Sequence, residues 1–234
     1  MSWWDLVRER LTPATGEGGV TAYGLSLVVL LAAGAVAWEP LWRRLRIGVT
    51  LVHELGHALV GLGAGRRFTG FVVRGDASGH AVTVGPARGA GRVATTWAGY
   101  PAPAAAGLLL VWAGARGYAA PLLTAVLLVL VVVATQVRSL LTAWVLAVVL
   151  AGVGAVWWWR DDTLQSYAAL ATGLVLLAGG WRGLVNVARR GRAIDDPAVL
   201  AALTHVPTVV WLTTWLAVNL GATWLAFVAV RASF

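Results

Sequence analysis

Apolar stretches about as long as a bilayer is thick dominate this sequence and constrain its fold more than any other feature. Hydrophobic residues make up 59% of the 234 residues and charged residues only 12%, which leaves too little polar surface to cover a soluble globule. A helix of about 20 apolar residues crosses the ~30 Å hydrocarbon core of a bilayer. Such stretches lie at residues 22–41, 47–65, 93–114, 118–135, 139–159, 164–181 and 207–230. They predict an all-α polytopic membrane protein of about six to seven transmembrane helices, built as a single domain over residues 1–234.

The charged residues indicate a membrane partner and exclude nucleic acid as the expected one. The net charge is +8 and all the basic residues are arginines, which lie mostly in short connections between apolar stretches. This placement suits topology signals and anionic lipid headgroups. With seven spans, the side of the N-terminal tail holds twice as many arginines as the other side. The positive-inside rule then predicts a multi-pass cell-membrane protein with a cytoplasmic N-terminus, and leaves the oligomeric state open.

The first 19 residues mix acids, arginines and tryptophans, which is not typical of a signal peptide. They predict either a frayed tail or a short interfacial helix. In the helix, Trp3, Trp4 and Leu6 would face lipid, while Arg8 and Arg10 would face water.

The segment 68–86 differs in composition from everything around it. Two short runs rich in Val, Thr and Phe flank the turn-forming letters "RGDASG", a pattern that predicts a β-hairpin; the alternative is an ordinary exposed loop. A hairpin would offer a strand edge to an extended peptide substrate. The candidate substrate contacts on it are Phe71, Val73, Val82 and Val84.

The apolar stretch 47–65 contains His53, Glu54 and His57 in the order H-E-x-x-H. On a helix, residues four apart share one face, so both imidazoles can bind one Zn²⁺. The glutamate is then near enough to act as general base toward an attacking water. Ionisable side chains inside a span are costly, which makes them functional candidates. The pattern predicts a catalytic zinc site with His53 and His57 as ligands and Glu54 as base.

A catalytic zinc site requires a third protein ligand, and the sequence contains no cysteine to supply it. Among the remaining acids and histidines, we favour Asp196, with Asp195 as second choice and His205 as a weaker candidate. Pro197 suits the first turn of a helix, so Asp196 could instead be a helix N-cap. The third-ligand segment is therefore placed at 195–207.

Three motifs together resemble the site-2 protease family of intramembrane zinc metallopeptidases. The stretch "TLVHELGHALVGLGAG" (50–65) resembles the family's first core helix, and "WAGYPAPAAAG" (97–107) its segment rich in small residues and proline. The stretch "DDPAVLAALTHVP" (195–207) stands where the family supplies its aspartate ligand. Here it is similar to a compact bacterial branch in which an Asp precedes a Leu-Thr-x-x-Pro sequence.

The sequence departs from the family pattern in two places. Tyr100 separates Gly99 from Pro101, where the family usually has a Gly-Pro pair, and the Asn that often follows is missing. The Asp-Gly signature of the third motif is also absent.

The resemblance implies an intramembrane endopeptidase that cleaves transmembrane segments of membrane proteins with Zn²⁺. It implies that Asp196 completes the metal site and that 99–103 loosens a helix near the metal, with Gly99, Tyr100 and Pro101 near the substrate. The alternative for that segment is a simple kink in tightly packed helices. Two other functions stay open: an inactive metal-binding membrane scaffold, and a transporter with a proton relay through His and Glu.

Overall fold

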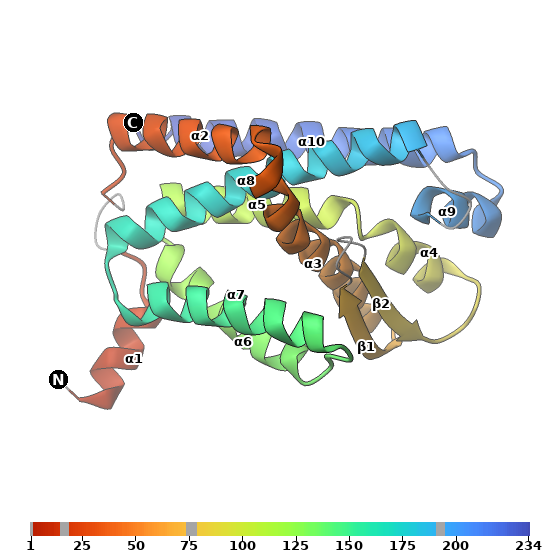
Figure 1. Cartoon of the computed structure of the whole chain (residues 1–234), viewed down its shortest axis with the longest axis horizontal. Coiled ribbons are helices and arrows are strands. Elements are labelled where there is room, and N and C mark those ends of the chain that lie inside the picture. The colour runs from red at the N-terminus through yellow and green to blue at the C-terminus, as the bar shows by residue number, and fades with distance from the viewer. Residues whose placement is uncertain (1, 15–18, 74–78, 191–194) are drawn as a thin grey trace.

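The computed structural model describes residues 2–14, 19–73, 79–190 and 195–234, and most of them are helical. Several long helices run along the long axis of the molecule (Figure 1). The hairpin, α4 and α9 lie at one end of that axis, and both chain termini lie at the other. The elements are α1 (Trp3–Leu11), α2 (Ala22–Ala37), α3 (Glu39–Gly63), β1 (Arg67–Val73), β2 (Gly79–Val84), α4 (Ala90–Trp97), α5 (Pro101–Ala115), α6 (Ala119–Ala134), α7 (Leu140–Trp158), α8 (Asp162–Arg190), α9 (Asp196–Thr204) and α10 (Thr208–Arg231).

The all-α membrane class is confirmed, but six to seven spans is too many for the described residues. Four helices, α3, α7, α8 and α10, are long and apolar enough to cross a membrane, and the bent pair α4–α5 makes a fifth. The helices α2 and α6 have 16 residues each. At 1.5 Å per residue this is about 24 Å, short of the ~30 Å core.

The metal-binding helix begins earlier than the hydropathy of 47–65 predicts. Helix α3 starts at Glu39, with Pro40 in its first turn, where a missing N–H costs nothing. Only Trp38 separates it from α2. In Figure 1, α2 and α3 therefore follow one another from the end with the termini toward the end with the hairpin.

The hairpin predicted at 68–86 is confirmed. Strands β1 and β2 pair antiparallel from Arg67↔Val84 to Val73↔Gly79, with an irregularity between Phe68 and Gly70. Phe71 lies opposite Ala81 in this register. The side chains of Phe71 and Val73, and the turn 74–78, lie outside the described residues.

Helices α5 and α8 form the centre of the molecule and pack unusually close together. A Cβ at Gly107 of α5 would lie 2.7 Å from the carbonyl of Gly173 in α8, and a Cβ at Gly173 would lie equally near the carbonyl of Gly107. The buried residues around this contact include Ala104, Val111 and Leu170. Small residues thus let two backbones meet, as is common where helices pack inside membranes.

The helix is interrupted between α4 and α5, and the two helices are bent by 60° relative to one another. Pro101 and Pro103 follow the break and lack the N–H groups that would bond back to it. The helix is interrupted at residues 98–100, which agrees with either a loosened helix or a simple kink. The break carries Gly99 and Tyr100 to the candidate metal site described below.

The N-terminal segment forms the helix α1 rather than a frayed tail. Ser2 and Asp5 cap it reciprocally, and Trp3 and Trp4 are exposed. The expectation that Arg10 faces water is wrong. Trp158 is the last residue of α7. The Arg10 guanidinium donates to its carbonyl oxygen (2.7 Å) and lies over its indole ring, so this side chain is held against the protein and not in water. The side chain of Leu6 lies outside the described residues.

Candidate metal centre

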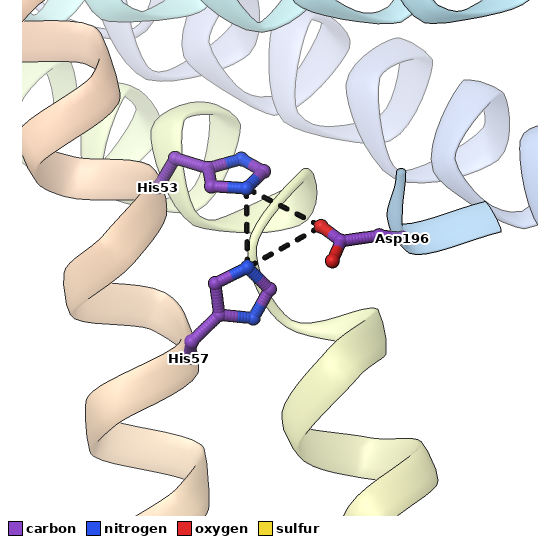
Figure 2. Close-up of side chains that lie close together, drawn as sticks. All are labelled: His53, His57 and Asp196. Atoms are coloured by element: carbon purple, nitrogen blue, oxygen red, sulfur yellow. Dashed lines mark hydrogen bonds and ion pairs between the residues drawn. The ribbon is translucent and has the colours of Figure 1, made fainter. Parts of the chain in front are cut away.

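His53 and His57 project from one face of α3 toward the start of α9 (Figure 2). Their Nε2 atoms are 3.1 Å apart, and the Asp196 Oδ2 atom lies 3.3 Å from each. All three side chains are largely shielded from solvent. The structure therefore brings together three ligand atoms that the sequence separates by most of its length.

Asp196, rather than Asp195, faces the histidines because of where α9 begins. Asp195 occupies the N-cap position in extended conformation and its side chain caps nothing. Asp196 is the first helical residue and Pro197 follows it. His205 ends α9 in the left-handed conformation and is exposed, as is His80 on β2, so neither histidine joins the group.

The surroundings keep Asp196 in the ionised form that binds metals. Burial on its own would raise the pKa of this carboxyl, but hydrogen bonds from His53 and His57 outweigh burial and hold the pKa well below its usual range.

The backbone of α4 orients His57. The Nδ1 atom lies 2.7 Å from the carbonyl oxygen of Thr95, and because a carbonyl can only accept, Nδ1 carries the proton. The Nε2 atom of the same ring faces Asp196 and His53. In many metal-binding histidines, the ring nitrogen that does not bind the metal donates to such a carbonyl, and this hydrogen bond fixes the tautomer and the ring orientation.

Glu54 is buried beside the pair and is held by the hairpin. Its Oε2 atom accepts a hydrogen bond from the backbone N–H of Ala81 (2.7 Å), and only 6% of the residue is exposed. Gly79 lies so close that a Cβ there would be 2.8 Å from Oε1 of Glu54. The start of β2 thus packs directly on the candidate general base.

The break between α4 and α5 passes alongside the imidazoles. A Cβ on Gly99 would collide with Nε2 of His57 and would lie 2.6 Å from Nε2 of His53. The ring of Tyr100 meets that of His53 edge-on, with centroids 4.8 Å apart, whereas Pro101 is buried. Among the other candidate substrate contacts, the side chains of Val82 and Val84 are exposed on β2.

The donor set and its spacing fit zinc. Two imidazole nitrogens and a carboxylate oxygen are ligands that zinc prefers, and tetrahedral bonds of about 2.1 Å separate ligand atoms by about 3.4 Å. The observed separations are 3.1 to 3.3 Å. Glycine at position 99 leaves open the space that any other side chain would fill beside both nitrogens. His53, His57 and Asp196 could therefore hold the ion together.

A polar cavity of about 550 Å³ lies beside this centre, on the side of Tyr100 and Asp195. Charged and polar side chains of α3 and α8 line much of it. Its lining is Glu39, Trp42, Arg46, Tyr100, Arg182, Gly183, Asn186, Val187 and Asp195. A wet cavity is the setting in which membrane proteins tolerate a broken helix.

Sequence reasoning missed the supports of these side chains. Thr95 and Ala81 act through backbone groups, which no side-chain pattern reveals. Trp215 of α10, which stacks on Tyr100, is one of 14 tryptophans, and nothing in its local sequence distinguishes it.

Comparison with known proteins bears on the same residues. A profile of the family described as Peptidase M50B-like matches residues 26–226, which include the H-E-x-x-H helix, the broken segment and α9. No curated protein and no solved structure gives a significant match. The profile covers most of the chain, and the chain therefore belongs to the peptidase M50B-like family, that is, to the site-2 proteases.

Proposed function

We propose that this protein is an intramembrane zinc endopeptidase that cleaves transmembrane segments of membrane proteins. The observation that carries the proposal is the group of His53, His57 and Asp196 with Glu54 beside it. The membrane helices and the peptidase family support it.

In this proposal Glu54 moves the protons. A bound Zn²⁺ would polarise the scissile carbonyl and make water a better nucleophile. Glu54 takes a proton from the attacking water and passes it to the leaving amine. The N–H of Ala81 holds Oε2 and so fixes the orientation of the carboxylate. The polar cavity beside Tyr100 could supply the water that the reaction consumes.

The number of ligands favours a hydrolase over the metal-binding scaffold. Within the described part of the chain, the metal-binding group has three members and no fourth His, Asp or Glu joins it. Catalytic zinc sites have three protein ligands and an open position, whereas structural sites have four.

We propose that an unwound substrate segment lies along the hairpin, near Gly99 and Tyr100. The contacts would come from Val82 and Val84 together with Phe71, Val73 and Pro101. The N–H of Ala81 already donates to Glu54. A substrate strand could therefore pair with β2 at Ala81 only by displacing the carboxylate of Glu54.

We propose that the end with the metal centre faces the cytoplasm. Arginines near the hairpin, in α4, before α7 and at the end of α8 outnumber those at the end with the termini. The first set is Arg66, Arg67, Arg88, Arg92, Arg138 and Arg189, and the second is Arg8, Arg10, Arg116, Arg160 and Arg231. By the positive-inside rule, both termini would then lie outside in this proposal. The seven-span count predicts a cytoplasmic N-terminus, but it treats α2 and α3 as separate crossings although they follow one another toward the same end.

The variant Glu54→Gln tests the function. It keeps the shape of the side chain but cannot accept the proton, so zinc content should be retained while cleavage of a co-expressed membrane substrate falls by roughly 100-fold or more. Glu9→Gln, in the exposed first helix, is the matched control and should cleave normally. Undiminished cleavage by Glu54→Gln would contradict the proposal. Proton flux in liposomes without bound zinc would support a transporter instead.

A further inference from the structure

Trp215 lies about two turns into α10 and is completely buried, although it is not one of the metal-binding residues. It packs in a cluster with Leu184, Val187 and Leu200 at the end of the molecule that holds the metal centre. Its contacts lead to each of the three candidate ligands through a different neighbour.

The first contact leads to His53 through Tyr100. The Tyr100 ring stacks on the indole of Trp215, with centroids 4.4 Å apart and planes 27° apart. The same ring meets His53 edge-on, at 4.8 Å and 88°. Tyr100 is therefore held between the indole and the imidazole, and the indole limits where His53 can turn.

The second contact leads to His57 through α4. The Nε1 atom of Trp215 donates to the carbonyl oxygen of Trp97 (3.1 Å). In an unbroken helix this carbonyl would accept from residue 101, but Pro101 has no N–H. Trp215 thus replaces a helical hydrogen bond that the break removes. The same short helix presents the Thr95 carbonyl to His57.

A reciprocal bond strengthens this attachment. The indole Nε1 of Trp97 donates to Oγ1 of Thr214 (2.9 Å), the residue before Trp215. The last turn of α4 is therefore tied to α10 by two hydrogen bonds that run in opposite directions.

The third contact leads to Asp196 through α9. Leu200 is fully buried in the cluster around Trp215. It lies four residues after Asp196, and such residues share one face of a helix. The packing of Leu200 against the cluster thus sets the direction of the face that carries Asp196.

We propose that Trp215 is the positioning residue of the metal centre, and that it holds all three ligands in register through Tyr100, Trp97 and Leu200. The inference rests on the proposed zinc site and goes beyond it, because it assigns the geometry of the site to a side chain that touches no ligand atom.

Two variants separate its contacts. Trp215→Phe keeps an aromatic ring for Tyr100 but loses the donor to Trp97, and Trp215→Leu loses both. The expected result is a fall in Zn²⁺ affinity of roughly tenfold for Phe and about 100-fold for Leu, as for other residues that orient metal ligands. The visible absorption bands of the Co²⁺-loaded protein should shift in both variants, because they report ligand geometry. Trp224→Phe, at an exposed position of the same helix, is the control and should change neither.

Thermal unfolding of the metal-free proteins shows whether each variant is folded. If Trp215→Leu is not folded, the zinc affinity and Co²⁺ bands of Trp215→Phe alone test the positioning role. Zinc affinity and Co²⁺ bands equal to those of the unchanged protein in both variants would overturn the positioning role and leave the proposed protease intact. An unchanged protein that binds zinc but cleaves nothing would overturn the protease and leave the positioning role. An unchanged protein that binds no zinc would overturn both.

Discussion

Asp195 and Asp196 are adjacent carboxylates, and their backbone conformations send them to different places. Asp195 precedes α9 in extended conformation and lines the polar cavity, whereas Asp196 begins the helix and meets both histidines. Two neighbouring residues can therefore be expected to differ completely in their effect on the metal.

Asp196→Asn should lower the affinity for zinc by more than about 100-fold, beyond the range typical of outer partners, because the amide replaces a charged ligand. Asp195→Asn should leave the affinity within about threefold, because that side chain is not in the ligand group. Zinc retained after dialysis against a competing chelator measures both. The opposite order of the two variants would mean that Asp195 is the ligand.

The sequence predicts these residues unequally, for a physical reason. The pair His53 and His57 follows from local spacing, because four residues make about one turn of any helix. Asp196 could only be ranked among candidates, because its distance from the pair depends on how α9 packs. The carbonyl of Thr95 and the N–H of Ala81 could not be predicted at all, because every residue has a carbonyl and every residue except proline has an N–H.

The hairpin is the element that bears most directly on the candidate base. At Gly79, where β2 begins, a Cβ would lie 2.6 Å from Cγ of Glu54 and 2.7 Å from Cγ2 of Thr50. Helix and strand can approach this closely only because the position is glycine. The hydrogen bond from Ala81 to Glu54 depends on the same approach.

Gly79→Ala should therefore push Glu54 out of place and lower kcat by roughly tenfold or more, the order of effect expected when a general base is displaced. Zinc content should not change, because the atoms nearest this position belong to Glu54 and Thr50 and not to His53, His57 or Asp196. Gly63→Ala, at the end of α3 where a Cβ meets open space, is the control. Normal turnover in Gly79→Ala would show that the hairpin does not position the base.

Elements were easier to predict than their ends. Alternating Val and Thr around a turn sequence indicated the hairpin, and the apolar stretches indicated helices. Hydropathy reports composition, however, and does not show where one helix stops. The first two turns of α3, which begin just after Trp38, carry Glu39 and three arginines. Hydropathy therefore assigned them partly to the end of the 22–41 stretch and partly to a loop before residue 47.

At the scale of the whole molecule, the candidate metal ligands and the groups that hold them lie at one end. The ligands come from α3 and α9, and their supports from the hairpin, α4 and α10. The opposite end holds the termini (Figure 1). There α1 bonds to the end of α7, and Ala14 donates to the carbonyl of Gly117 after α5. This division lets a single measurement fix the side of the membrane on which the site lies.

The chain contains no cysteine, so single cysteines report topology without a background. Ala202→Cys lies on the exposed side of α9 and Phe234→Cys at the exposed C-terminus. Because arginines accumulate at the metal end, a membrane-impermeant maleimide added to intact cells should label Phe234→Cys. It should label Ala202→Cys only after the membrane is permeabilised. The reverse pattern would put the termini in the cytoplasm, as the seven-span count predicts. Labelling of both from the same side would contradict the arrangement of the two ends across the bilayer.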